Sequence, residues 1–323
     1  MYKSKSLFTL IMMTGTILTI SSNNWISMWM GLEINMMAFI PLINSKNKNS
    51  PQAMMIYLLT QSVSSVILMF SIIMSHISLM GSFNNLMMIS LLIKLGAAPF
   101  HMWLPEVMTK MTWDSAAVLM TWQKIAPLTM INSMNYNNKI MYGTILGSVI
   151  VGAVGGINQL SMRKIMGYSS INHLGWMLSL MKMKNNWTIY LTIYSTMIIM
   201  LCWTFKHHNM MHINQIKSMN MTMSEKMNYL IAMMSLGGLP PFLGFLPKWM
   251  VIQTLINNNL MVMMTVMVMF SLLSLYYYLR TMTGIMMSFS LESKWLTTKT
   301  NNTMVTMMMM LNMSLPMVMI INM

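Results

Sequence analysis

The chain contains one ten-residue pattern twice: GAAPFHMWLP at residues 96–105 and GLPPFLGFLP at residues 238–247. Each copy lies in or beside a long apolar run. Because proline removes a backbone donor and clashes with the preceding turn, a helix must end or break at each copy. Broken backbone at membrane depth is tolerated only where it lines a polar cavity, so we favour a functional break over a kink that only serves packing. The break residues common to both copies are Gly96, Pro99, Pro105, Gly238, Pro241 and Pro247.

Composition identifies the class of protein. Of the 323 residues, 56% are apolar and only 7% are charged, against roughly 25% in an average soluble domain. Mean hydropathy is +0.58, and apolar runs of about 20 residues recur along the chain. These values exclude a soluble globular enzyme, a secreted disulfide scaffold and a disordered tail. The net charge of +14 does not indicate nucleic-acid binding, which would need a basic face on a soluble body.

The apolar runs predict an all-α polytopic membrane protein with eleven spanning helices. The first run follows Lys3 and Lys5, as in a signal peptide. It has no small-residue cleavage site and a second run follows at once, so we expect an uncleaved helix. The predicted spans are residues 6–22, 25–43, 53–77, 85–98, 113–132, 139–157, 165–181, 187–205, 227–257, 260–283 and 303–321.

The basic residues predict the orientation of these helices. If the N-terminus lies on the inner side, thirteen basic residues lie in inner connections and three in outer ones, which is the bias of the positive-inside rule. After eleven spans the C-terminus is then expected on the outer side. The inner connections hold Lys3, Lys5, Lys46, Lys48, Lys110, Arg163, Lys164, Lys206, Lys217, Lys226, Arg280, Lys294 and Lys299, and the outer ones hold Lys139, Lys182 and Lys184.

Five predicted helices separate the two copies of the break pattern, which predicts two inverted repeats. A repeat with an odd number of spans inserts upside down relative to its partner, as in many transporters. We therefore expect one membrane domain over residues 1–323, with helices 1–5 (about 1–135) and helices 6–10 (about 138–287) as its halves. Residues 303–321 would form an extra C-terminal helix.

Apart from Asp114, Lys139 and Arg280, which lie at or near the ends of spans, four charged residues lie inside the predicted spans: Glu33, Lys94, Lys124 and Lys248. A charged residue at the bilayer centre costs about 2.5–3.5 kcal/mol, so each of them needs a reason. We expect an ion pair between Glu33 and Lys94, on helices 2 and 4, whose members change protonation together. Lys124 and Lys248 would continue a hydrated proton path. For Lys124, extension of the side chain to the membrane interface is the alternative.

The remaining candidate residues are histidines and one cysteine. His173 lies on predicted helix 7 and is either a proton relay or a structural histidine. His207, His208 and His212 lie in a loop with no acid nearby, which favours a solvated loop over a metal site. With Cys202 as the one cysteine, disulfides and iron–sulfur ligand sets are excluded. The sequence has no dinucleotide or phosphate loop, so we expect no cofactor and no metal on this chain.

Methionine is unusually abundant, with 54 residues dispersed over every predicted segment. Dispersal argues against a copper site built of clustered thioethers. Where the codon AUA encodes Met, an A/T-rich gene replaces Ile by Met. We therefore expect a product of an animal mitochondrial ribosome, which makes the inner side the matrix and the outer side the intermembrane space.

Three motifs resemble the chain 2 family of NADH–ubiquinone oxidoreductase, the antiporter-like subunits of respiratory complex I. They are IKLGAAPFHMWLPE at residues 93–106, TWQKIAP at residues 121–127 and GGLPPFLGFLPKW at residues 237–249. YSSI at residues 168–171, with His173, is similar to the wider antiporter-like family. The resemblance covers essentially the whole chain, and the Met- and Asn-rich composition is typical of an insect or related invertebrate.

The resemblance implies a fold and a function. The fold is antiporter-like with broken helices, and animal members lack three N-terminal helices of the bacterial form. The function is proton translocation across the mitochondrial inner membrane, as a core membrane-arm subunit coupled to NADH:ubiquinone electron transfer. NADH, FMN, iron–sulfur clusters and ubiquinone belong to other subunits, so this chain carries no redox centre. A structural membrane-arm spacer and a free-standing cation/proton antiporter are the alternatives.

The resemblance also implies residue roles and partners. Glu33 and Lys94 would be the coupled pair. Lys124 would be the connecting lysine and Lys248 the terminal lysine of the half-channel, while His173 matches by motif with a less defined role. The implied partners are an adjacent antiporter-like subunit, the small subunit 4L, accessory subunits and lipids, but no nucleic acid.

Overall fold

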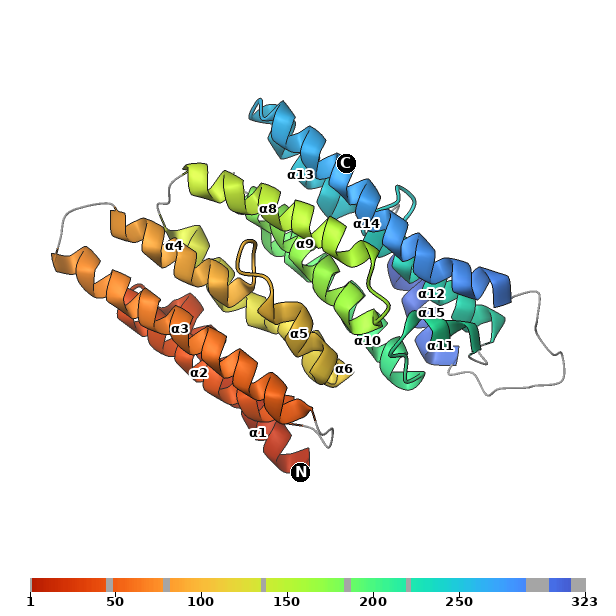
Figure 1. The fold of residues 1–323 in the computed structure, drawn as a ribbon, viewed down its shortest axis with the longest axis horizontal. Coiled ribbons are helices and arrows are strands. Elements are labelled where there is room, and N and C mark those ends of the chain that lie inside the picture. The colour runs from red at the N-terminus through yellow and green to blue at the C-terminus, as the bar shows by residue number, and fades with distance from the viewer. Residues whose placement is uncertain are drawn as a thin grey trace. The chain divides into compact units, whose positions relative to one another are not determined.

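The computed structural model describes residues 2–44, 49–77, 82–134, 138–182, 187–218, 222–288 and 302–314, and it is built of helices (Figure 1). Helices suit an apolar chain because they satisfy backbone hydrogen bonds within each segment. In chain order the elements are α1 (Tyr2–Ser21), α2 (Trp25–Ile43), α3 (Ser50–Ile77), α4 (Ser82–Leu95), α5 (Trp103–Lys110), α6 (Trp113–Met120), the 3-10 turn η1 (Trp122–Lys124), α7 (Ile125–Ser133), α8 (Asn138–Ile157), α9 (Met162–Lys182), α10 (Trp187–His207), α11 (Ile213–Ser218), α12 (Met223–Gly237), α13 (Phe245–Asn257), α14 (Met261–Ser288) and α15 (Asn302–Asn312).

Both predicted helix breaks are confirmed. α4 ends at Leu95, directly before Gly96, and the helix predicted over residues 227–257 is divided into α12 and α13. The two short helices α5 and α11 were not predicted, because each is too short to give an apolar run of its own. α15 covers the beginning of the predicted helix 303–321, and residues 315–321 lie outside the described residues.

The prediction of one continuous helix over residues 113–132 was wrong. The 3-10 turn η1 interrupts this run between α6 and α7. Pro127 accounts for the interruption, because it lacks the amide hydrogen that would bond to the carbonyl of Gln123 and its ring clashes with that carbonyl. The apolar pattern continues across the turn, so the pattern alone does not reveal it. The interruption places Lys124 in irregular backbone.

The chain forms two compact units, Met1–Ser148 and Val149–Met323, whose boundary falls inside α8. In the first unit α1, α2 and α3 lie side by side (Figure 1). Two glycines bring α1 and α2 together: a Cβ on Gly15 would be 3.0 Å from Gly31 O, and a Cβ on Gly31 would be 2.6 Å from Thr19 Cγ2. Small residues at such contacts allow membrane helices to approach closely.

Glycines also bring α8 and α9 together in the second unit. A Cβ on Gly152 would be 2.6 Å from Asn172 N, and one on Gly155 would be 2.4 Å from Tyr168 Cε1. α14 packs against α9, α11, α12 and α13. Arg280 on α14 donates to backbone carbonyls at the end of α8, where a helix has no amide of its own to offer.

Five of the described helices have the length and composition of a membrane span: Trp25–Ile43, Ser50–Ser75, Asn138–Ile157, Trp187–His207 and Met261–Met286. Two shorter helical stretches, Lys5–Ser21 and Phe83–Leu95, are also apolar. The two interrupted helices consist of pieces that are individually too short for this criterion. The count of eleven spans, their inverted arrangement and the division into repeats therefore stay predictions.

Candidate functional site

Both helix breaks have the same backbone geometry. Gly96 has a φ of +70° and Gly238 a φ of +77°, in the left-handed region that favours glycine. At each break the glycine amide donates three residues back and the next amide donates five residues back, at 2.9 to 3.3 Å. This pair of bonds is the Schellman motif, in which a left-handed glycine ends a helix and satisfies its last carbonyls. The repeated pattern in the sequence thus has a repeated structure.

Beside the first break, a lysine on α4 forms an ion pair with a glutamate on α2. Lys94 lies in the last turn of α4, and its Nζ is 3.4 Å from Glu33 Oε1 on α2, which confirms the predicted contact. The side chain of Lys94 is 3% exposed and that of Glu33 is 22% exposed. The ammonium is therefore inside the first unit, whereas the carboxylate reaches its surface.

Two side chains bond to carbonyls in the last turn of α4. Because α4 ends at Leu95, these carbonyls lack the amides of a following helical turn, although Ile93 O also accepts the amide of Gly96 at 3.1 Å. Gln61 Nε2 on α3 donates to Lys94 O at 3.3 Å, and Trp103 Nε1 on α5 donates to Ile93 O at 3.2 Å. These bonds attach α3 and α5 to the end of α4 and so fix the backbone of Lys94.

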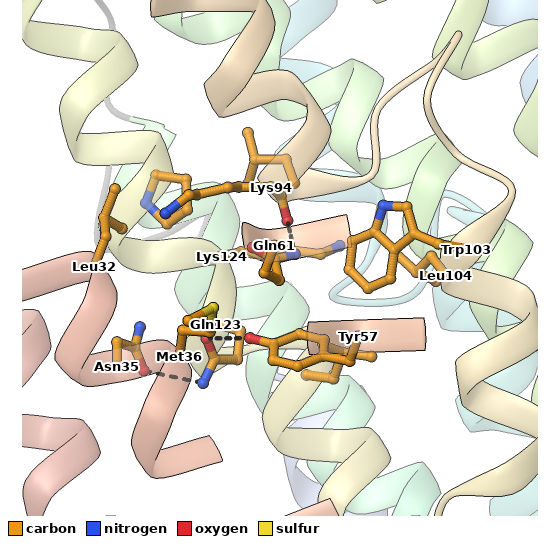
Figure 2. A pocket seen from close by; sticks show the side chains of 13 residues that line it. Leu32, Asn35, Met36, Tyr57, Gln61, Lys94, Trp103, Leu104, Gln123 and Lys124 are labelled. Carbon is orange, nitrogen blue, oxygen red and sulfur yellow. Dashed lines mark hydrogen bonds between the residues drawn. The ribbon is translucent and has the colours of Figure 1, made fainter. Parts of the chain in front are cut away.

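A cavity within the first unit is lined by two buried lysines. It has room for a water-sized molecule, and Lys94 and Lys124 both line it (Figure 2). Lys124 lies in η1 and is 3% exposed. Its side chain is therefore buried in the unit, which argues against extension to the membrane interface.

Three neutral polar side chains that line this cavity form a hydrogen-bonded row (Figure 2). Gln123 Nε2 donates to Asn35 Oδ1 at 2.9 Å, and Tyr57 OH donates to Gln123 Oε1 at 3.5 Å. Asn35 is two residues after Glu33 on α2, and Gln123 directly precedes Lys124 in η1. The row therefore connects the helix that carries Glu33 to the turn that carries Lys124. No role was predicted for these residues, although Gln123 lies within the motif at residues 121–127. The sequence did contain a signal for Asn35 and Gln123: each is a side-chain amide inside an apolar span, and such a group needs a hydrogen-bond partner at membrane depth.

In the second unit Lys248 bridges the second break. It lies in the first turn of α13, is 5% exposed, and donates from Nζ to the carbonyl of Gly237, the last residue of α12, at 2.7 Å. The ammonium therefore occupies a helix C-terminus, where the helix dipole favours a cation. Nζ also lies 5.8 Å from the centroid of the Trp176 ring, within the range of a cation–π contact.

His173 lies on α9 in the same unit, beside the second break. Its Nδ1 is 2.8 Å from Tyr190 OH, and its ring centroid is 4.9 Å from that of Tyr194. These three side chains line a small cavity together with Pro247, the residue before Lys248. His173 thus lies beside the first turn of α13, across a small cavity from Pro247. Its hydrogen-bond partner Tyr190 was not predicted from the motifs.

The four break prolines fall into two kinds of position. Pro99 and Pro241 lie between helices, where the backbone is irregular. Pro105 and Pro247 lie in the first turns of α5 and α13, where a missing amide hydrogen breaks no helical bond. Pro99 and Pro241 therefore prevent the helix from continuing through each break, and Pro105 and Pro247 are compatible with the first turn of the next helix.

The sequence spacing suggested that no acid lies near His207 and His208, but in the structure Glu225 is close enough to act on His208, which directly follows α10. Burial lowers the pKa of His208 from its ordinary 6.5, while nearby Glu225 raises it and His207 lowers it. Glu225 also accepts the amide of Thr222 at 3.1 Å at the start of α12. Within the part of the chain that the structure describes, no group of three His, Cys, Asp or Glu residues could hold a metal ion.

Comparisons with known proteins identify the family. Residues 22–274 match the family described as NADH:quinone oxidoreductase/Mrp antiporter, TM. NADH-ubiquinone oxidoreductase chain 2 of Anopheles gambiae is 44% identical over 306 residues, which are 91% of this chain and 89% of that protein. The chain belongs to the NADH-ubiquinone oxidoreductase chain 2 family. The family resemblance of the three motifs is thereby confirmed.

Other members and solved structures agree with this assignment. Chain 2 of Locusta migratoria, another insect, is 41% identical over 318 residues, 96% of this chain and 93% of that protein. A chain of respiratory complex I from Thermus thermophilus has a TM-score of 0.79 at 19% identity, covering 89% of this chain and 76% of its own. A chain of the Mrp complex from Dietzia sp. has a TM-score of 0.74 at 16% identity, covering 86% of this chain and 59% of its own. This chain 2 member therefore has the all-helical, antiporter-like membrane fold.

Proposed function

We propose that the chain is a core membrane-arm subunit of respiratory complex I and contributes to proton translocation across the mitochondrial inner membrane. The observation that carries the proposal is the contact of Lys94 Nζ with Glu33 Oε1 at 3.4 Å beside a helix break. Ionisable residues inside membrane spans are costly and mark proton or ion pathways. The chain 2 relatives support membership of NADH:ubiquinone reductase, in which redox cofactors and ubiquinone would belong to other subunits.

The Glu33–Lys94 pair would act as a proton switch. An ionised carboxylate beside the ammonium favours the protonated lysine. When Glu33 is neutralised, the ammonium stays in an apolar surrounding without its counter-charge, which is unfavourable. Lys94 then releases a proton from Nζ to water in the cavity that it lines. Because Glu33 reaches the surface of the unit, charge changes in a neighbouring subunit can act on it.

Lys124 would receive the proton next, because it lines the same cavity as Lys94. The bond of Gln123 to Asn35 keeps the turn that carries Lys124 in register with the helix that carries Glu33. In the second unit His173 and Lys248 would continue the path, with Lys248 as its terminal lysine. Their places beside the second break support this order.

The arrangement in the membrane is part of the proposal. Eleven spans would form two inverted five-helix repeats and an extra C-terminal helix, with the N-terminus in the matrix and the C-terminus in the intermembrane space. The two left-handed glycines at Gly96 and Gly238 support the repeats, because they end helices with the same bonds. The partners would be an adjacent antiporter-like subunit, the small subunit 4L and accessory subunits.

A high-resolution map of the assembled complex tests the path. We expect ordered waters that connect Lys94 Nζ to Lys124 Nζ through the shared cavity. A dry apolar plug between these two amines in every state of the working complex would contradict the path. The control is the region around the solvent-facing Lys139, whose waters should be independent of the state of the complex.

The structural likeness to a chain of the Mrp complex favours a second candidate, cation/proton antiport. Purification distinguishes the two functions. A complex I subunit should co-purify with many partners and lose its fold without them, whereas a free-standing antiporter should survive alone and exchange cations in vesicles. Cation exchange by the isolated chain would replace the first proposal with the second.

A further inference from the structure

The C-terminal helix α15 completes the second helix break. Leu243 lies between α12 and α13, and its amide donates to the carbonyl of Asn312, the last residue of α15, at 3.2 Å. The last carbonyls of a helix have no amide of their own, so Asn312 O is free to accept this bond. The neighbouring amides of Leu239 and Phe242 bond instead to residues of α12 and of the break itself.

The side chain of Asn312 adds a second contact. Its Oδ1 lies 3.0 Å from Ser235 Oγ on α12, whose single hydroxyl hydrogen is shared between Asn312 Oδ1 and Ala232 O, the latter at 2.7 Å. Asn312 Nδ2 donates to Met308 O within α15 at 3.0 Å. Asn312 is 5% exposed and Ser235 is fully buried. In such a surrounding a hydrogen bond is electrostatically stronger than in water, so these contacts favour one orientation of the Asn312 side chain.

Ser235 on α12 also contacts Gly244, the last residue of the break before α13. A Cβ on Gly244, the residue before α13, would be 1.8 Å from Ser235 O. Four residues after Gly244, Lys248 donates its ammonium to Gly237 O at 2.7 Å. Ser235 therefore connects Asn312 to the short segment that places Lys248.

A further polar contact fixes the other end of α15. Asn228 Nδ2 on α12 donates to Val305 O on α15 at 2.7 Å, and Asn228 is 3% exposed. α15 is thus bonded to α12 near both ends. The first break is closed differently, by the side chains of Gln61 and Trp103 from α3 and α5.

We propose that α15 is a clamp on the second helix break and that Asn312 is a positioning residue for Lys248. The bonds from Asn312 to Ser235 and Leu243 hold the break closed, so that the ammonium of Lys248 reaches the last carbonyl of α12. This role rests on the proposed proton path through Lys248. It assigns a task to the helix that lies outside both expected repeats.

The test uses the whole complex with Asn312→Leu, which keeps a branched side chain and the backbone bond from Leu243 but removes both hydrogen-bonding atoms of the Asn312 side chain. Met310→Leu is the control, because Met310 lies on the same helix and is 76% exposed. We expect deuterium exchange of residues 239–247 to accelerate about tenfold in Asn312→Leu and to stay unchanged in the control. We also expect the alkaline limb of the pH profile of proton translocation to move to lower pH, because the ammonium of Lys248 loses its carbonyl acceptor.

Ser235→Ala removes the same bond from the other side and is the milder change. Because both substitutions remove the same bond, the two together should cost little more than Asn312→Leu alone. Unchanged exchange and an unchanged pH profile in both variants would overturn the clamp if Lys248→Met stops proton translocation in the same assay. If Lys248→Met leaves translocation intact, the proposed function fails at this residue, and exchange of residues 239–247 still decides whether α15 holds the break.

Discussion

Gly238 and the side chain of Lys248 pack against each other so closely that only glycine fits. A Cβ on Gly238 would lie 2.7 Å from Lys248 Cδ and 2.8 Å from its Nζ. The same glycine ends α12 with a φ of +77°, which other residues rarely adopt. The residue that breaks the helix therefore also makes room for the lysine that bridges the break.

Gly238→Ala should destabilise the second unit by about 1–3 kcal/mol, through the left-handed backbone and the displaced Lys248 side chain. The measurement is the midpoint of thermal inactivation of the assembled complex. Gly143→Ala is the matched control, because a Cβ there meets nothing within 4 Å and alanine favours a helix. Equal midpoints for the two variants would show that Gly238 and Lys248 are not packed as described.

Gly31→Ala should force α1 and α2 apart. Its Cβ would meet Thr19 Cγ2 at 2.6 Å and Gly15 O at 2.8 Å, and the second contact is backbone that cannot rotate away. Because Glu33 is two residues further along α2, we expect weaker proton translocation together with faster deuterium exchange in α1. Exchange and translocation both equal to those of Gly143→Ala would contradict the close approach.

Gln123→Leu should destabilise the first unit by about 1–3 kcal/mol, because it leaves Asn35 Oδ1 buried without its donor. Adding Asn35→Leu should recover much of this loss, since an apolar pair leaves no polar group unsatisfied at that contact. A double-mutant cycle on thermal stability measures the coupling. Strictly additive effects would mean that the bond of 2.9 Å contributes nothing.

His208 should titrate below its ordinary pKa of 6.5, because burial disfavours the charged ring. The folded chain then binds fewer protons here than the unfolded chain, so this group destabilises the fold as the pH falls below 6.5 and has no effect well above it. Glu225 opposes the shift, so Glu225→Gln should lower the pKa of His208 further, and His207→Gln should raise it. Histidine C2-hydrogen exchange measures each value, and a pKa at or above 6.5 in the unsubstituted chain would refute the prediction.

The helix breaks could be predicted from the sequence because proline and glycine act on the local backbone. The pairing of Glu33 with Lys94 could also be anticipated, since each needs a partner of opposite charge at membrane depth. The 3-10 turn that contains Lys124 was not predicted, because the apolar residues on its two sides resemble one continuous span, although Pro127 marks the interruption. The partners of Gln123, His173 and Asn312 were also out of reach, since spacing does not reveal which distant side chain satisfies a buried polar group.

Protons translocated per electron by complex I with Lys94→Met test the central claim most directly. Lys139→Met is the matched control, because it removes the same charge from an exposed lysine. The account predicts that Lys94→Met lowers the rate of translocation about a hundredfold or more and lowers the number of protons per electron, while the control changes neither. An assembled Lys94→Met complex that translocates protons with unchanged stoichiometry would contradict the proton path and favour a structural role for the buried pair.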